Sequence, residues 1–370
     1  MRVGTVTEIK RNEFRVGLTP NNVRDYVNHG HEVFVQAGAG EGSSFLDADY
    51  MTAGATILPA KEDVWATCDM VVKVKEPLEA EYPLMREGQI VYTFLHLAAD
   101  RALTEVLIKN KVNAIAYESI VDAQGGLPLL RPMSEIAGKL SVQAGAKALE
   151  KPQGGRGVLL GGAVGVQKGE VIVLGGGIVG TAAMKMAMGL GANVTIFDNN
   201  LDRLTYLDDV FGAQIQTMYS TPANIAAALP TADLVIGAVL IPNAAAPKLI
   251  RREHLKTMKP GSVIVDVAVD QGGCAETTVA TYHDNPTFVV DGVIHYCVAN
   301  MPGAVSQTST YALTNATLNY GLKLANMGLE AACKSDDGLL QGVNTYKGAL
   351  TVEAVATGFD LPYTNIKELI

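Results

Sequence analysis

Residues 171–198 read VIVLGGGIVGTAAMKMAMGLGANVTIFD, and this stretch decides the fold class of the chain. Its first four residues are an apolar run, which predicts a buried strand. Three glycines follow with the spacing G-x-G-x-x-G, namely Gly175, Gly177 and Gly180. Residues 178–190 are typical of a helix, and the apolar run 194–197 predicts a second strand that ends at Asp198. This order of elements predicts a βαβ unit that binds a dinucleotide.

Each glycine of this motif has a different expected task. The first permits a tight turn, the second lets the backbone approach a pyrophosphate, and the third lets the helix pack on the strand. The helix N-terminus offers free N–H groups to the phosphates. Asp198 lies where a carboxylate can accept from ribose hydroxyls, which favours NAD over NADP, although the nearby Arg203 could bind a 2′-phosphate. The alternative is a glycine-rich turn without a ligand.

The composition limits the size and class of the protein. At about 150 residues per domain, 370 residues suggest two domains, and 48% hydrophobic residues can fill two cores. A net charge of −9 argues against nucleic acid or an anionic membrane as a partner. The four cysteines are scattered without a CxxC motif, so we expect reduced thiols and no metal site. Without an apolar leader or a run of 18 apolar residues, we expect a cytoplasmic protein.

Short apolar runs alternate with helical patterns along the whole chain, which predicts an α/β fold with mostly parallel sheets. The strands expected before the central unit are 3–6, 32–36, 70–74, 90–94 and 112–116, and the helices are 19–30, 100–110 and 132–149. The strands expected after it are 214–216, 234–239, 262–267 and 287–290, and the helices are 201–210, 221–229, 248–258 and 305–326. The last helix could return the chain to the first domain, which would make that domain discontinuous.

Four polar residues follow the carboxyl ends of expected strands: Arg15, Lys75, His96 and Asp270. Ligands of open parallel sheets bind beyond this edge. Because Asp270 belongs to the second domain and the others to the first, a cleft between the domains would gather all four. Taken singly, Arg15 and Lys75 could be surface charges, His96 a buried histidine with its hydrogen bonds satisfied, and Asp270 the cap of a turn.

As a set, these residues suit a dehydrogenase of an amino or hydroxy acid. The guanidinium of Arg15 can bind a carboxylate through two parallel hydrogen bonds. Lys75 can polarise a carbonyl or imine, and a histidine such as His96 can exchange a proton as hydride leaves. Asp270 can orient the lysine or an attacking water. The residues alone therefore predict an NAD-dependent dehydrogenase acting on a small anion.

Long and specific motifs recur along the chain. In order they read MRVGTVTEIKRNEFRVGLTP (1–20), VVKVKEP (71–77), TFLHLAAD (93–100), RPMSEIAGKL (131–140), VIVLGGGIVG (171–180), GAVLIPNAAAPKL (237–249), VIVDVAVDQGG (263–273) and YCVANMPGAVSQTSTYALTNAT (296–317). Over essentially its whole length the chain resembles the alanine dehydrogenase family, which includes the NAD-binding subunit of proton-pumping transhydrogenase. The extra Gly176 inside the glycine motif is a small departure that we expect to be tolerated.

The resemblance implies two Rossmann-like, doubly wound domains around an interdomain cleft. Residues 1–128 and 307–370 would form the substrate domain, and 129–306 the NAD-binding domain. The implied reaction is the reversible oxidative deamination of L-alanine to pyruvate and ammonia, with NADH formed, in a homohexamer. By the same resemblance Arg15 and Lys75 hold pyruvate, His96 is the acid and base, and Asp270 assists at the iminium–carbinolamine step.

The expected cofactor contacts come from the fingerprint and from the resemblance, which puts Asn300 and Met301 by the nicotinamide. They are Ser134, Gly175, Gly177, Ile178, Val179, Gly180, Asp198, Arg203, Ser220, Val239, Leu240, Val267, Ala268, Val269, Asp270, Val298, Asn300 and Met301.

Two other functions stay open. A transhydrogenase subunit would exchange hydride with NADP(H) on a partner, but we expect no membrane extension here. A protein that binds NAD without turnover would be expected to lack part of the polar set, which is complete in this chain.

Overall fold

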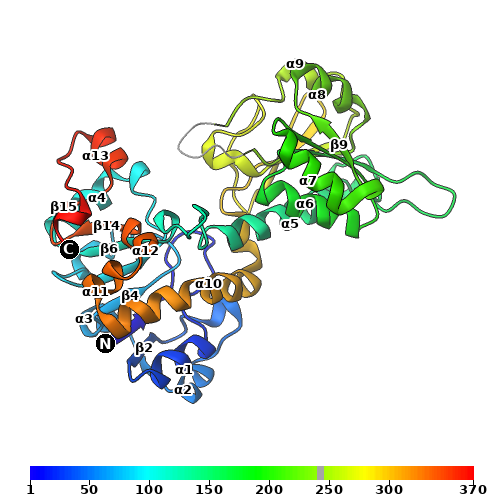
Figure 1. The fold of residues 1–370 in the computed structure, drawn as a ribbon. Helices are drawn as coiled ribbons and strands as arrows, with labels where there is room; N and C mark the ends of the chain where they lie inside the picture. Colours follow the sequence, from blue (N-terminus) through cyan, green and yellow to red (C-terminus); the bar gives the residue numbers. More distant parts are fainter. Residues whose placement is uncertain (240–245) are drawn as a thin grey trace. The chain divides into compact units, whose positions relative to one another are not determined.

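A computed structural model of the chain describes residues 1–239 and 246–370. These residues divide into two compact units. Unit 1 combines Met1–Met133 with Gly303–Ile370, and unit 2 is Ser134–Pro302. In Figure 1 the colours of unit 1 include both blue and red, because both ends of the chain belong to it.

Unit 1 is built on an eight-stranded sheet with the order β15-β14-β6-β5-β4-β1-β2-β3. Its parallel part consists of β1 (Arg2–Thr5), β2 (Glu32–Gln36), β3 (Thr56–Leu58), β4 (Met70–Val72), β5 (Ile90–Thr93) and β6 (Asn113–Ala116). In sequence order these six strands run 3-2-1-4-5-6 across the sheet, the arrangement of dinucleotide-binding folds. The antiparallel strands β14 (Val343–Tyr346) and β15 (Ala349–Leu350) extend the sheet beyond β6.

The helices of unit 1 follow its strands and cover a core of mainly Val, Leu and Ala. They are α1 (Pro20–Asn28), α2 (Asp47–Thr52), α3 (Lys61–Thr67), α4 (Arg101–Lys109), α10 (Ser306–Met327), α11 (Leu329–Lys334), α12 (Asp337–Gln341) and α13 (Glu353–Phe359). The start of α1 is closed by a capping box. Asn22 N donates to Thr19 Oγ1 at 3.3 Å, and Thr19 N donates to Asn22 Oδ1 at 3.0 Å.

Unit 2 is built on a seven-stranded sheet with the order β12-β13-β11-β10-β7-β8-β9. Its strands are β7 (Glu170–Leu174), β8 (Asn193–Asp198), β9 (Gln216–Tyr219), β10 (Leu234–Gly237), β11 (Val263–Asp266), β12 (Thr287–Val290) and β13 (Val293–Tyr296). All are parallel except β12, which pairs antiparallel with β13. The parallel strands again run 3-2-1-4-5-6, so the prediction of two Rossmann-like, doubly wound α/β units is confirmed.

The helices of unit 2 pack on this sheet and on one another. They are α5 (Arg131–Ala148), which begins just before the unit boundary, α6 (Ile178–Gly189), α7 (Leu201–Phe211), α8 (Pro222–Ala228) and α9 (Arg252–Leu255). A Cβ at Gly138 of α5 would lie 2.2 Å from Val179 O and 2.8 Å from the Ala182 side chain. The small residues of α5 therefore allow it to pack closely against α6.

Several local predictions are incomplete or wrong. The strands β3, β13, β14 and β15 were not predicted, and β13 pairs between β12 and β11. The strand expected over 214–216 is β9, which shares only Gln216 with it. The helix expected over 248–258 is only the short α9. The backbone N–H groups of Leu249 and Ile250 donate to Cys274 O instead, at 2.8 and 3.1 Å, and these tertiary bonds hold the chain extended there.

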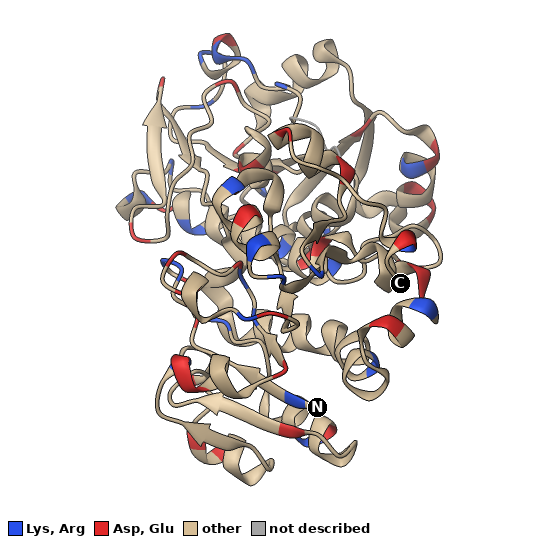
Figure 2. Ribbon diagram, turned by 90° about the vertical axis from the view of Figure 1, so that its left-hand side faces the viewer, with Lys and Arg blue, Asp and Glu red and all other residues tan. Residues whose placement is uncertain are grey.

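Lys and Arg are interspersed with Asp and Glu along the ribbon in Figure 2. Some of these charges meet in local surface pairs, such as Arg101–Glu105 and Lys147–Glu150. Within residues 1–239 and 246–370, the helices are too short or too polar to cross a bilayer.

Candidate functional site

The glycine turn of unit 2 connects β7 to α6, and each glycine has its expected geometry. Gly175 has a φ of +101°, which the tight turn requires. A Cβ at Gly180 would lie 1.7 Å from Gly175 O, so only glycine fits there. At Gly177 a Cβ would meet no described atom within 4 Å, so the backbone faces open space.

Gly177 is also the N-cap of α6, and within the described residues no side chain caps this helix. Ile178 is exposed and Val179 buried, so the first turn of α6 presents its backbone to that open space. Uncapped N–H groups and the positive end of a helix dipole suit a phosphate. The turn therefore fits the pyrophosphate of a dinucleotide.

Asp198 lies beside this turn at the end of β8. Its Oδ2 accepts from Gly176 N at 2.7 Å, its Oδ1 accepts from Asn200 N at 2.8 Å, and its backbone O accepts from Ser220 N at 2.9 Å. Each carboxylate oxygen can accept a second hydrogen bond, so Asp198 keeps capacity for a ribose hydroxyl. Arg203, from the first turn of α7, lies on the other side of Gly176.

The other predicted cofactor residues of unit 2 follow neighbouring strands. Val239 follows β10, whereas Leu240 lies outside the described residues. Val267, Ala268, Val269 and Asp270 form a 3₁₀ segment directly after β11. Val298, Asn300 and Met301 follow β13, with Val298 and Met301 buried and Asn300 at a φ of 62°. Because parallel strands end at one edge, the structure brings these residues to the edge that carries the glycine turn.

Ser134 is a further predicted cofactor residue of unit 2, and a buried carboxylate, Asp266, holds the loop that contains Asp270. Ser134 lies one turn before Gly138, on the face of α5 that packs against α6. Asp266 is fully buried at the end of β11 and accepts from Ala268 N at 3.2 Å and Cys274 N at 2.7 Å. These bonds fix the loop that leads to the exposed Asp270.

In unit 1, three predicted residues gather where the strand order reverses, between β1 and β4. Arg15 follows β1, Lys75 follows β4, and His96 follows β5, the parallel neighbour of β4. The loops after β1 and β2 line a hollow of about 350 Å³ whose described walls include Lys10, Glu13 and Arg15, but not Lys75 or His96. A reversal point of this kind is the usual ligand position in a doubly wound sheet.

Arg15 is buried and oriented by Glu13. Its Nε donates to Glu13 Oε1 and its Nη2 donates to Glu13 Oε2, both at 2.6 Å, and both side chains are at most 2% exposed. Its Nη1 also contacts Met133 Sδ at 3.0 Å. Two parallel hydrogen bonds fix the plane of the guanidinium, which sets the direction of its remaining donors.

The backbone of Lys75 is held by hydrogen bonds, whereas in the described residues no carboxylate forms an ion pair with its Nζ. Lys75 N donates to Glu8 Oε1 at 3.3 Å, and Lys75 O accepts from Thr93 Oγ1 at 2.9 Å. Burial lowers the pKa of Lys75, and the positive charge of Arg15 lowers it further, against the opposing effect of Glu76. A half-buried ammonium in this setting favours an anionic ligand.

The neighbouring Lys73, in contrast to Lys75, forms ion pairs with carboxylates. It is fully buried between two carboxylates, with Nζ 3.0 Å from both Glu8 Oε2 and Glu81 Oε1. Although burial opposes its charge, these two carboxylates raise the pKa of Lys73. Glu8 also accepts from Val74 N at 2.6 Å, so the ion pair anchors the backbone that carries Lys75.

His96 is fixed by carboxylates on two sides. Its backbone has a φ of 51°, and its N–H donates to Glu118 Oε1 at 2.6 Å. Its ring stacks on Phe94, and Nδ1 lies 3.1 Å from Glu76 Oε2. Burial opposes the ionisation of Glu76, but hydrogen bonds from His96 and Lys10 outweigh it and lower the pKa of Glu76 to about 2.

Because ionised Glu76 can only accept, Nδ1 of His96 donates the proton of this bond. The other ring nitrogen, Nε2, is then the one available for proton exchange. The His96 side chain is 45% exposed, so the ring can be reached by a ligand.

Both halves of the chain match known proteins. The family models of the alanine dehydrogenase/PNT N-terminal and C-terminal domains match residues 4–137 and 141–353. The chain belongs to the alanine dehydrogenase/PNT family. It is 55% identical over 365 residues to the alanine dehydrogenase of Methanococcus maripaludis, with 98% of each chain covered. It is 52% identical over 364 residues to that of Mycobacterium tuberculosis, again with 98% of each covered.

Two solved structures are similar as well. An L-alanine dehydrogenase matches with a TM-score of 0.95 and 54% identity, covering 97% of this chain and 99% of its own. A transhydrogenase from Sinorhizobium meliloti matches with a TM-score of 0.82 and 25% identity, covering 96% and 100%. Membership of the alanine dehydrogenase/PNT family indicates a nicotinamide dinucleotide as cofactor, which agrees with the geometry of the glycine turn.

The residues of this family member that sequence reasoning missed are the carboxylate partners of Arg15 and His96. Glu13 and Glu76 were not singled out, although Glu76 directly follows Lys75 and Glu13 stands two residues before Arg15. A carboxylate next to a predicted catalytic cation was the available signal. Groups of His, Cys, Asp or Glu that could hold a metal are absent from residues 1–239 and 246–370.

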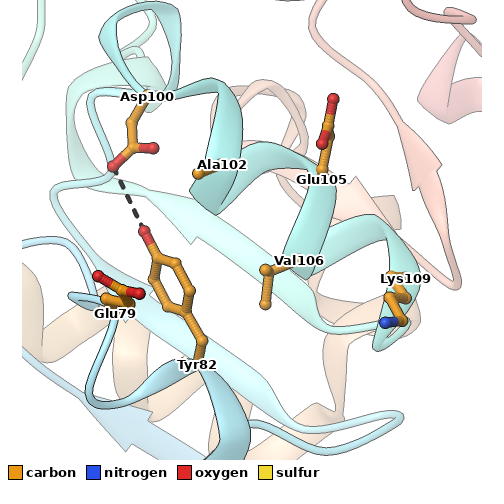
Figure 3. Close-up of a pocket in the computed structure, with 7 residues that line it drawn as sticks. All are labelled: Glu79, Tyr82, Asp100, Ala102, Glu105, Val106 and Lys109. Carbon is orange, nitrogen blue, oxygen red and sulfur yellow. Dashed lines mark hydrogen bonds between the residues drawn. The ribbon is translucent and has the colours of Figure 1, made fainter.

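A second hollow of about 690 Å³ lies along α4. Figure 3 shows the Tyr82 hydroxyl pointing at Asp100, to which it donates at 3.5 Å. Burial and the negative charge of Asp100 raise the pKa of Tyr82 to about 12, so this bond persists at neutral pH. The described lining includes none of the predicted site residues, and we assign it no part in the site.

Replacing Glu76 by Gln should destabilise the chain at neutral pH and progressively less in acid. The folded pKa of Glu76 is about 2, below its ordinary 4.5, so its charge contributes stability that is complete above about 4.5 and lost as the pH falls toward 2. Gln keeps the shape without the charge. Urea unfolding between acidic and neutral pH measures the free energy of unfolding of the variant against that of the unaltered chain. Glu105→Gln, on an exposed pair with Arg101, is the control, and a difference that did not shrink in acid would contradict the prediction.

Proposed function

We propose that this chain is an NAD-dependent alanine dehydrogenase, which catalyses the reversible oxidative deamination of L-alanine to pyruvate and ammonia with formation of NADH. The observation that carries the proposal is the half-buried ammonium of Lys75, which is close to Arg15 at the reversal point of unit 1 and forms no ion pair with a carboxylate among the described residues. Full-length relatives that are alanine dehydrogenases support it.

In this proposal Arg15 and Lys75 hold the substrate carboxylate, and the Lys75 ammonium also faces the keto oxygen. Two cations close to a developing negative charge stabilise it, and burial strengthens their effect. NAD supplies the hydride acceptor when it is bound. His96 Nε2 takes a proton from the amino acid in one direction and returns it in the other, while Glu76 holds the ring. Asp270 is proposed to assist at the iminium–carbinolamine step.

An absorbance assay at the NADH band tests the proposal. We expect oxidation of NADH when pyruvate and ammonium are both supplied, and reduction of NAD with L-alanine. Hydride exchange between NADH and NADP without pyruvate would favour a transhydrogenase role instead. Binding of NADH without either reaction would favour a protein without turnover.

The proposal includes NAD as the preferred cofactor. Asp198 at the end of β8 favours a ribose 2′-OH and repels a 2′-phosphate. We expect Asp198→Ser to lower the ratio of kcat/KM with NADH to kcat/KM with NADPH. Since Asp198 also accepts from Gly176 N, some loss of NADH affinity should accompany the change. Equal efficiency of the unaltered enzyme with both cofactors would contradict this prediction.

Replacing Arg15 by Ala should act mainly on the KM for pyruvate. A carboxylate clamp binds ground state and transition state about equally, so its loss raises KM more than it lowers kcat. Loss of Arg15 also removes an ion pair of the buried Glu13, so thermal unfolding must be measured in parallel. A variant with normal KM and reduced kcat would place Arg15 outside the carboxylate site.

The family resemblance also motivates a cytoplasmic homohexamer. Light scattering of the purified chain tests the oligomer, and a monomer with full activity would contradict it. Fractionation of the source cells tests the location.

A further inference from the structure

The peptide group of Gly176 is held at both of its polar atoms. Gly176 N donates to Asp198 Oδ2 at 2.7 Å, and Gly176 O accepts from Arg203 Nε at 2.6 Å. A Cβ at Gly176 would lie 3.1 Å from Asp198 Oδ2 and 3.2 Å from Leu207 Cδ1. The residue that departs from the fingerprint is therefore tightly enclosed between β8 and α7.

The side chain of Arg203 connects three elements. Besides its bond to Gly176, its Nη2 donates to Thr181 Oγ1 in the first turn of α6 at 2.7 Å. Thr181 Oγ1 in turn donates to Gly176 O at 3.0 Å. The guanidinium lies 4.9 Å over the ring of Tyr206, and Arg203 N donates to Asn200 Oδ1 at 3.1 Å. The plane and direction of the guanidinium are thus set by the protein itself.

We propose that Arg203 is a positioning residue that holds the glycine turn in the shape that accepts a pyrophosphate, and not a ligand of a 2′-phosphate. Gly176 stands between the tight turn at Gly175 and the open backbone at Gly177. Fixing its peptide group fixes the direction of the N–H groups that follow, where a dinucleotide approaches. The inference rests on the proposed dinucleotide function of unit 2.

An arginine at this place could either bind a 2′-phosphate or shape the turn that accepts the pyrophosphate. A ligand of the 2′-phosphate would matter for NADPH and not for NADH. A residue that shapes the pyrophosphate turn matters equally for both, because both carry the same pyrophosphate. An arginine that acts only by its charge could be replaced by lysine, whereas the fork that reaches Gly176 O and Thr181 Oγ1 together could not.

Dinucleotide binding to Arg203→Met and Arg203→Lys tests the proposal. By fluorescence titration we expect both variants to bind NADH and NADPH roughly tenfold more weakly, with the ratio of the two dissociation constants unchanged. Hydrogen exchange of the backbone amides over 175–181 should also be faster in the ligand-free variants. Arg251→Met, at an exposed arginine 3.8 Å from Glu253, should change neither quantity.

Three results would overturn the inference: a loss confined to NADPH, full rescue by Arg203→Lys, or normal affinity and amide exchange in Arg203→Met. If the unaltered chain binds neither dinucleotide, the proposed function itself fails. Thermal unfolding of each variant identifies global destabilisation, and Thr181→Val then removes one end of the contact while Arg203 is retained. This variant should weaken both dinucleotides in the same proportion.

Discussion

Lys75→Ala is expected to lower kcat/KM for pyruvate by roughly 10⁴, through kcat and KM together. The ammonium of Lys75 is proposed both to hold the substrate carboxylate and to face the keto oxygen, so its loss removes ground-state binding and transition-state stabilisation. Steady-state kinetics with pyruvate and ammonium measure the effect. NADH affinity, titrated separately by fluorescence, should be unchanged.

The fold should survive this loss, which separates a functional lysine from a structural one. Burial lowers the pKa of Lys75 in the folded chain, so the charged form costs stability near neutral pH, and this cost fades as the pH rises through the folded pKa. Lys75→Met should therefore unfold at an unchanged or higher temperature. The matched control is Lys73→Met, which leaves Glu8 and Glu81 buried without their cation and should cost about 3–5 kcal/mol. A similar loss of stability in both variants would contradict the assignment.

His96→Ala is expected to lower kcat by roughly 10²–10⁴ while NADH still binds. The geometry supports a proton-transfer role, because Glu76 accepts from Nδ1 and leaves Nε2 available, and the ring stacks on Phe94. Kinetics of the variant at saturating pyruvate and ammonium measure the effect on kcat.

His29→Ala is the control for this experiment, since His29 is the exposed C-cap of α1 and its ring contacts only the Asp25 carbonyl among the described hydrogen bonds. It should keep normal kcat. If His96→Ala keeps it too, His96 is structural, and Asp270 becomes the next candidate for the acid.

The parts of the fold that could be predicted from sequence are those governed by local patterns. The βαβ unit around Gly175 was predicted because apolar runs, glycine spacing and a helix pattern stand in order over a short segment. The Thr19–Pro20 helix start was predicted because a side-chain cap acts within one turn. The helix over 248–258 failed because the tertiary bonds of Leu249 and Ile250 to Cys274 override the local preference.

In the candidate site too, local sequence patterns could be predicted, whereas contacts between distant residues could not. Arg15, Lys75 and His96 could be placed at strand ends from sequence, and β4 and β5 are indeed neighbours. The pairing of His96 with Glu76 could not be predicted, because the two residues are 20 positions apart and meet only through the sheet. The functional roles of these residues, and of Asp270, stay predictions.

The two units share one strand order, and the opening turns of α1 and α6 differ in a way that matches the different ligands we propose for them. In α1 the Thr19 hydroxyl occupies the amide of Asn22, and Pro20 removes another donor, whereas in α6 the glycine turn leaves such amides open. The start of α1 therefore offers fewer open amides to a phosphate, and the anion that we propose for unit 1 would be attracted by side-chain cations such as Lys75. A phosphate site at α1 would first require a redesign of its opening turn, with the strand order left as it is.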